Sequence, residues 1–290
     1  KIGGGIISLK CGGGKTVLAL HIISMLKKKP IVVVHKDFLM TQWYDRIKQF
    51  LPDAKIGKIQ QNTIDIEGKD IVLFRHEPYN QTAHVTKKQH LIHNWCDLLG
   101  IEYKNQQPVL FPNYPQRMTT GIWQRPKPVM VIQTGGGPMQ GQKFSYSWTR
   151  DMPIEVAQEI INKYSQQYHI IQVTRPDGYQ LPGAERIDGP LSNMELFSLL
   201  VTSQKRVLID SCLQHAAAAL KLQSTVLWVG TSPTVFGYSS HKNIIAKLPK
   251  KANQLIGSYL FDYQFENNMH ECPYMDVKDM FNIEEIFKSI

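Results

Sequence analysis

A glycine-rich turn close to the start of the chain constrains the fold more than any other feature. The turn reads Leu9-Lys10-Cys11-Gly12-Gly13-Gly14-Lys15-Thr16. In such a turn the glycines let backbone N–H groups curl around phosphate oxygens, the lysine neutralises their charge, and the threonine hydroxyl holds Mg²⁺. An apolar run at 6–9 and helical spacing over 16–26 predict a strand, a loop and a helix. The turn therefore predicts a phosphate-binding loop for ATP, with Mg²⁺ at Thr16 and Gly12, Gly13, Gly14 and Lys15 around the phosphates.

The residues that follow alternate between strand and helix patterns. Pro30 ends the first helix, and the β-branched, uniformly apolar run 31–34 predicts a buried parallel strand. Residues 38–50 predict a second amphipathic helix, and 70–73 a further short strand. Residues 1–73 therefore predict a partial α/β segment built around the phosphate loop.

Beyond Leu73 the chain changes character. Residues 75–89 are polar, a short helix is expected over 89–99, and 105–128 contain five prolines, which predict an extended linker. The predicted organisation is a loop-containing segment at 1–73, a junction and linker at 74–128, and a second α/β domain at 129–290.

The second α/β domain is predicted from a renewed alternation of strands and helices that starts at Val129. The expected strands are 129–132, 170–173, 206–209 and 225–229, and the expected helices are 153–164, 193–202 and 213–220. This alternation predicts a Rossmann-like α/β fold with a parallel sheet.

Two of these strands end in polar or small residues, at Asp210 and at Gly230-Thr231. Ligands of open α/β sheets bind outside the carboxyl ends of the strands, so both turns are candidates for a site. Ser211 is expected to cap the next helix, whose first N–H groups would suit a diphosphate. An alternative remains open, in which Asp210 is a helix-cap residue and His215 is a packed helix residue.

Residues 1–73 resemble the ATP-binding domain of superfamily 2 helicases of large DNA viruses. The matching stretches are LKCGGGKT (9–16), VVVHKDFLMTQWYDRIKQFLP (32–52) and KIGKIQ (55–60). The resemblance implies ATP binding with Mg²⁺. A DExH motif should follow, with one carboxylate for the metal and one for the attacking water, but the sequence has neither DExH nor DEAD. We therefore expect nucleotide binding without hydrolysis or unwinding.

Residues 76–290 resemble the donor-binding half of a GT-B fold in the ADP-heptose:lipopolysaccharide heptosyltransferases. The family pattern Asp-Ser/Thr-Gly, two residues, His and a small-residue helix maps onto Asp210, Ser211, Cys212 and His215, with Cys212 in place of the usual glycine. Further matches are VIQTGGG (131–137) and IDGPLSNMELFSLL (187–200). The resemblance implies a nucleotide-diphosphate sugar as donor and a glycan or lipid-linked acceptor.

The same resemblance implies roles for individual residues. Asp210, His215 and Lys143 are the expected catalytic residues, which would orient the donor and stabilise the departing diphosphate. The expected contacts to the nucleotide sugar are Ser211, Cys212, Glu185, Gly230 and Thr231, with Glu185 at the donor ribose. The acceptor domain of the family, which carries the catalytic base, matches only a short tail at 90–102.

Other features of the sequence suggest alternative sites and partners. His84, His90, His93 and Cys96 have spacings that could gather around a metal ion, although no carboxylate completes a known pattern. Ser211 lacks the Gly-x-Ser-x-Gly context of a hydrolytic nucleophile. The net charge of +9 would also suit nucleic acid. The Lys27–Lys29 run has a simpler explanation, because cations are favoured at the end of a helix.

The sequence favours a cytoplasmic protein without a membrane span. No apolar stretch approaches the ~20 residues that cross a bilayer, and four widely spaced cysteines indicate a reducing compartment. The chain begins with Lys1 rather than methionine, which favours a fragment or a trimmed chain. The hypothesis is a junction near 73–75 between a truncated motor segment and a glycosyltransferase-like domain. The alternatives are an ATP-binding helicase-like protein without hydrolysis and an inactive binding module.

Overall fold

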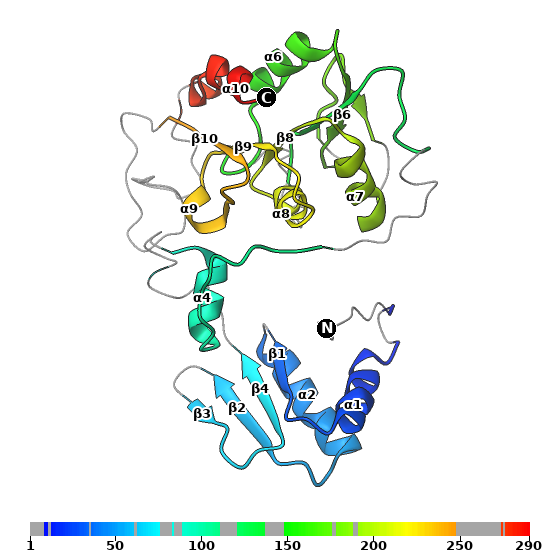
Figure 1. The fold of residues 1–290 in the computed structure, drawn as a ribbon, viewed down its shortest axis with the longest axis vertical. Helices are drawn as coiled ribbons and strands as arrows, with labels where there is room; N and C mark the ends of the chain where they lie inside the picture. The colour runs from blue at the N-terminus through cyan, green and yellow to red at the C-terminus, as the bar shows by residue number, and fades with distance from the viewer. Residues whose placement is uncertain are drawn as a thin grey trace. The chain divides into compact units, whose positions relative to one another are not determined.

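In the computed structural model the chain divides into two units, Lys1–Pro78 and Tyr79–Ile290 (Figure 1). The structure describes residues 9–10, 13–34, 36–60, 63–75, 83, 89–110, 121–136, 148–175, 178–187, 191–247, 274 and 276–290. Most of the strand expected at 6–9 lies outside these residues. Among the described helices, none combines the length and the apolar character needed to span a bilayer.

The described residues of the first unit form two helices and four strands. They are α1 (Lys15–Leu26), β1 (Ile31–Val34), α2 (Asp37–Phe50), β2 (Ile56–Gln60), β3 (Thr63–Asp65) and β4 (Ile71–Arg75). Both predicted helices and the predicted strand at 31–34 agree with these bounds to within one residue. The short strands β2 and β3 were not predicted.

The sheet of the first unit has the order β1-β4-β2-β3, in which β1, β4 and β2 are parallel and β3 is antiparallel to β2. Its core joins α1 and α2 to one face of β1 and β4, where Val32 and Val34 are buried. On the other face Ile31 and Val33 are 56% and 52% exposed. The prediction of a strand buried on both faces is therefore wrong, because within the described residues the helices cover one face.

The second unit contains a larger sheet with helices between its strands. Its elements are α4 (Leu91–Leu98), β5 (Val129–Gln133), α6 (Ile154–Tyr164), β6 (His169–Val173), β7 (Glu185–Arg186), α7 (Asn193–Thr202), β8 (Lys205–Ile209), α8 (Cys212–Ala219), β9 (Thr225–Trp228), α9 (Pro233–Phe236), β10 (Lys242–Ile245), η2 (Val277–Met280) and α10 (Ile283–Ser289). The six strands are all parallel and lie in the order β10-β9-β8-β5-β6-β7. This is the doubly wound order of a Rossmann fold, as expected.

Two separate hydrophobic clusters show that helices cover both faces of this sheet. One cluster packs α6, η2 and α10 against alternate residues of β5, β8 and β9, and the other packs α7 and α8 against the remaining ones. Strand β5 is consequently buried at every position. The order of the strands reverses between β5 and β8, so the carboxyl ends of these two strands form the topological switch point of the sheet.

Segments before β5 also belong to the second unit. The amide of Leu110 donates to the carbonyl of Ala219 at the end of α8, over 3.0 Å. Trp123 is 4% exposed, packs in the cluster of α7 and α8, and donates its indole N–H to the carbonyl of Glu195. Much of what the sequence predicts to be linker thus contacts this unit.

Candidate functional site

The clearest cluster of polar groups lies where β8 and β9 end. Asp210 follows β8 and is 8% exposed, and the Thr231 hydroxyl donates to its Oδ2 over 2.6 Å. Burial raises the pKa of Asp210, while the bond from Thr231 and the charge of Arg150 act in the opposite direction. The structure therefore brings two of the predicted site residues into direct contact.

Gly230 holds a neighbouring segment tightly against the end of β9. Its amide donates to the carbonyl of Thr149 over 2.8 Å. A Cβ atom at Gly230 would lie 2.8–2.9 Å from the Cβ, Cα and carbonyl oxygen of Thr149. Only glycine fits here, because the residues just before α6 approach the backbone so closely. This close approach places those residues beside the Asp210–Thr231 pair.

The first turn of α8 begins directly after Asp210. Ser211 occupies the N-cap position in an extended conformation, but its side chain accepts no hydrogen bond from the helix. The expectation that the Ser211 hydroxyl caps this helix is therefore wrong. Cys212 follows as an exposed thiol, 3.8 Å from the Ser211 hydroxyl. Within the described residues no side chain caps the first-turn N–H groups of α8, and their partial positive charge favours an anion at this position.

His215 lies in the first turn of α8 and contacts a residue that sequence reasoning missed. Its Nδ1 lies 2.8 Å from the hydroxyl of Tyr238, just after α9. Burial lowers the pKa of His215 to about 4 and raises the pKa of Tyr238 to about 12, so both side chains are uncharged near neutral pH. The charge of Asp210 also raises the pKa of Tyr238, so Asp210 is close enough to interact electrostatically with the Tyr238 hydroxyl that contacts His215.

A buried ion pair on the other side of the switch point was also missed. Arg175, after β6, donates to both carboxylate oxygens of Asp151 at 2.7 and 3.3 Å, and the two side chains are 5% and 2% exposed. The amide of Gly136, after β5, donates to Asp151 Oδ1 over 3.1 Å. Asp151 thus ties together the turns after β5 and β6. The sequence signal was weak, because the two partners lie far apart along the chain.

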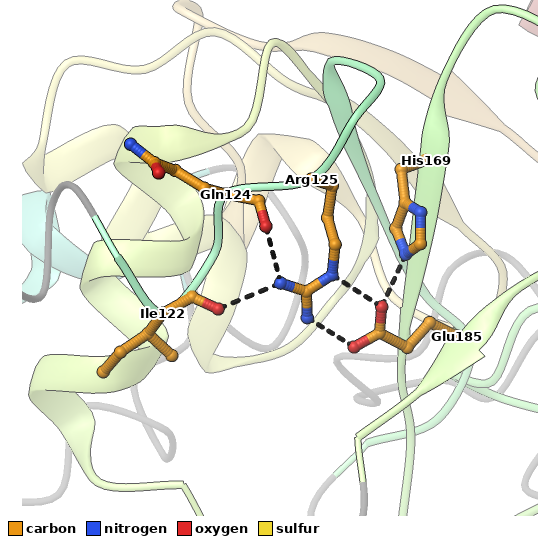
Figure 2. Close-up of polar contacts among 5 residues, drawn as sticks. All are labelled: Ile122, Gln124, Arg125, His169 and Glu185. Atoms are coloured by element: carbon orange, nitrogen blue, oxygen red, sulfur yellow. Dashed lines mark hydrogen bonds and ion pairs between the residues drawn. The ribbon is translucent and has the colours of Figure 1, made fainter.

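Glu185 does not join these residues. It lies in the edge strand β7, where Arg125 donates to both of its oxygens at 2.6 and 2.8 Å and His169 approaches at 2.5 Å (Figure 2). Arg125 also donates to the carbonyls of Ile122 and Gln124. The hydrogen bond from Arg125 is the main cause that lowers the pKa of Glu185 to about 2.

His169 begins β6, so the Glu185 carboxylate lies toward the amino ends of the strands. Strand β7 is separated from β8 by β5 and β6. Glu185 therefore lies at the other end of the strands from Asp210 and Thr231, and its contact with a donor ribose stays a prediction. Lys143, the remaining expected catalytic residue, lies outside the described residues.

In the first unit, the described part of the glycine-rich loop leads directly into α1. Gly14 has φ 76°, a left-handed conformation that suits glycine, and it is the N-cap of α1. The Lys15 ammonium donates to the carbonyls of Leu9 and Lys10 at 3.0 and 3.1 Å. Lys15 and Thr16 begin the helix as a phosphate loop requires. Cys11 and Gly12 lie outside the described residues.

The histidines considered as metal ligands have other partners. His90 caps α4, since its Nδ1 accepts a hydrogen bond from the amide of Ile92. His93 lies 3.5 Å from the Asp97 carboxylate and stacks on Tyr103. Within the described residues no group of three or more His, Cys, Asp or Glu side chains is arranged for a metal. His84 lies outside them.

Comparison with known proteins supports the resemblance predicted for the first unit. The model of the ResIII family, described as the res subunit of type III restriction enzymes, matches residues 2–105. A protein of Acanthamoeba polyphaga mimivirus whose name calls it an ATP-dependent RNA helicase is 39% identical over 70 residues. The DNA 3'-5' translocase XPB2 of Sulfurisphaera tokodaii is 47% identical over 70 residues. These matches span 24% of this chain but 14% and 16% of the relatives' lengths.

Comparison with solved structures confirms the predicted GT-B-like fold. A glycosyl transferase family 9 protein from Veillonella parvula matches with a TM-score of 0.52 at 11% identity, over 83% of this chain and 69% of that chain. The E. coli ADP-heptose LPS heptosyltransferase II also matches, with a TM-score of 0.41 at 12% identity, over 89% of this chain and 97% of that chain. At these identities the likeness is one of fold.

Proposed function

We propose that the second unit is a glycosyltransferase-like domain that binds a nucleotide-diphosphate sugar at the carboxyl ends of β5, β8 and β9. The observation that carries this proposal is the uncapped first turn of α8, which begins beside the buried Asp210 at the switch point of a doubly wound sheet. Doubly wound sheets bind nucleotides at this position, and helix amino termini favour phosphate groups.

The described residues suit the charge that develops when the bond between sugar and diphosphate breaks. The first-turn amides of α8 would stabilise the departing diphosphate as fixed dipoles that need no reorganisation. Arg150, whose charge acts on Asp210, adds positive potential nearby. Asp210 would accept hydrogen bonds from donor hydroxyls, and the uncharged His215 would donate one. Lys143 remains a prediction as a further cation, and the sugar acceptor is a glycan or lipid-linked hydroxyl.

Binding measurements with matched variants test this assignment. We expect an ADP-sugar or a UDP-sugar to bind in isothermal titration calorimetry, and Asp210→Ala to weaken binding at least about tenfold, the loss of a charge-assisted hydrogen bond. Asp210→Asn keeps an acceptor for Thr231, so it separates loss of charge from loss of the local fold. Full affinity in both variants would refute the role of Asp210, and no binding of any nucleotide sugar would refute the proposed function.

A second function belongs to the first unit, where Gly14 and Lys15 have the local arrangement of a phosphate loop. We infer that this unit binds ATP without hydrolysing it, since the sequence lacks the DExH carboxylates. When bound, Mg²⁺ would neutralise phosphate charge, and Thr16 would hold it. Lys15→Ala should abolish ATP binding and leave sugar-nucleotide binding unchanged, while Asp210→Ala should weaken sugar-nucleotide binding and leave ATP binding unchanged. Each variant therefore serves as the control for the other.

A further inference from the structure

Tyr238 lies among three histidine side chains in the second unit. Its ring centroid is 5.5 Å from those of His90 and His215 and 6.0 Å from that of His241. Tyr238 is 6% exposed, so its hydroxyl depends on protein partners. Burial is the main cause that lowers the pKa of each of these histidines. The cluster is therefore a set of uncharged rings, in which hydrogen bonds decide where each imidazole proton resides.

The Tyr238 hydroxyl has one hydrogen-bond partner in the described part of the chain, Nδ1 of His215 at 2.8 Å. Because the phenol stays protonated and the imidazole is neutral, the hydroxyl can donate and Nδ1 can accept. An accepting Nδ1 leaves the proton of His215 on Nε2. The direction of this one bond therefore decides the tautomer: a donating hydroxyl keeps the proton of His215 on Nε2, whereas a donating Nδ1 would keep it on Nδ1.

Two other close neighbours do not distinguish between the ring nitrogens of His215. Gln214 Nε2 lies 3.2 Å from both nitrogens, and it also donates to the carbonyl of Phe236 over 3.1 Å. His241 contacts the backbone instead, with its Nε2 2.9 Å from the carbonyl of Gln214. Among these described side chains, Tyr238 is the one that contacts a single ring nitrogen of His215.

We propose that Tyr238 is a positioning residue of the nucleotide-sugar site, whose hydroxyl holds His215 as the Nε2–H tautomer and so presents Nε2–H as the donor to the ligand. This inference rests on the proposed function of the second unit. It adds that an uncharged N–H, fixed by a tyrosine from the turn after α9, recognises a phosphate or hydroxyl oxygen of the donor. Without the hydroxyl, His215 would exchange between tautomers and rotamers, and part of the population would present an acceptor to that oxygen.

The test compares Tyr238→Phe with Tyr164→Phe in the full chain. Tyr164 is a matched control because its hydroxyl donates to a backbone carbonyl, that of Phe287 over 3.2 Å, away from α8. Imidazole ¹⁵N chemical shifts of His215, assigned with His215→Gln, report the tautomer without any ligand. ADP affinity is measured by calorimetry on the same proteins, each also carrying Lys15→Ala so that the proposed phosphate loop of the first unit does not bind the ligand, and thermal unfolding shows whether each variant is folded.

We expect His215 to be the Nε2–H tautomer in the unmodified protein and in Tyr164→Phe, and a mixture of tautomers in Tyr238→Phe. ADP affinity should fall about 3- to 10-fold in Tyr238→Phe, as for one lost or weakened hydrogen bond, and stay unchanged in Tyr164→Phe. A His215 that carries its proton on Nδ1, or that keeps a single tautomer in Tyr238→Phe, would overturn the proposal. Failure of the unmodified protein to bind ADP or any nucleotide sugar would instead refute the proposed function, and the ¹⁵N shifts would still decide whether Tyr238 positions His215.

Discussion

At the scale of single residues, Glu185 couples the stability of the second unit to pH. Its carboxylate is held by Arg125 and His169, and its folded-state pKa is about 2, below the ordinary value of 4.5. A depressed carboxyl pKa contributes stability that is complete above the unfolded-state pKa and is lost as the pH falls through the folded-state pKa. The stabilisation from this cluster should therefore disappear between about pH 4.5 and pH 2.

Glu185→Gln should lower the free energy of unfolding by about 1–2 kcal/mol at pH 7, a value reduced from the full pKa shift because the side chain is partly exposed. The difference from the unmodified protein should shrink as the pH falls below about 4.5, as measured by urea unfolding at several pH values. Glu102→Gln is the control, since Glu102 pairs with Lys104 on the surface. An equal loss in both variants, or a difference independent of pH, would contradict this account.

Two glycines of the candidate site give opposite expectations for the same substitution. Gly230→Ala would force a Cβ to within 2.8–2.9 Å of Thr149, so it should cost about 1–3 kcal/mol, as overpacking does. At Gly136 the nearest atom to a new Cβ is Asp151 Oδ1 at 3.9 Å, and Gly136→Ala should be nearly neutral. Thermal unfolding compares the two. A tolerated Gly230→Ala would show that residues 148–151 can move away from β9.

At the scale of elements, strand β1 shows how far an apolar run predicts burial. The run 31–34 predicted the strand and its parallel pairing, since β-branched residues favour both. It could not show that α1 and α2 pack on the face of Val32 and Val34, because that depends on which helices the rest of the fold supplies. The residue pattern within a strand predicts the strand itself. Whether helices cover one face of the strand or both depends on the rest of the fold.

The exposure of β1 predicts contrasting effects at adjacent positions. Val32→Thr places a hydroxyl in the core and should cost the first unit about 1–2 kcal/mol. Ile31→Thr should change stability by less than about 0.5 kcal/mol, since that side chain is already 56% exposed. Urea unfolding monitored by tryptophan fluorescence would compare them, with Trp43 packed against the same core. Equal losses would mean that the Ile31 face is covered in solution.

The longer elements of the second unit were predictable and its shorter ones were not. Helix α7 begins with a capping box of Ser192 and Glu195, a local signal that the sequence displays directly. Strand β7 consists of Glu185 and Arg186, which carry no apolar pattern and are defined by pairing with β6. The same limit applies to the site. Asp210 and Thr231 were found because each follows a strand, whereas Tyr238 and the Asp151–Arg175 pair depend on contacts between distant segments.

At the scale of the whole molecule, two different resemblances meet in one chain. The ResIII match runs to residue 105, past the boundary of the first unit at Pro78 and through α4. Within the structure, however, His90 at the start of α4 contacts Tyr238 of the second unit. Neither resemblance accounts for the chain alone, and the packing of α4 assigns this helix to the second unit.

Because each unit has its own hydrophobic core, we expect two unfolding transitions in calorimetry. An ADP-sugar should stabilise the second unit and ATP with Mg²⁺ the first, each by about 2.7 kcal/mol at a hundredfold excess over Kd. Val32→Thr identifies the transition of the first unit, because it should lower the unfolding temperature of that transition alone. One cooperative transition, shifted equally by both nucleotides, would contradict two independently stable units.

Chemical modification of the exposed thiol at the start of α8 can measure whether a ligand occupies the candidate site. Cys212 is solvent-accessible while Cys96 is buried, so a small alkylating reagent should modify the peptide with Cys212 and spare the one with Cys96. A phosphate seated over the helix terminus would shield that sulfur and slow the reaction. Peptide mass spectrometry could then follow occupancy in the unaltered protein and screen candidate donors by the protection that each confers.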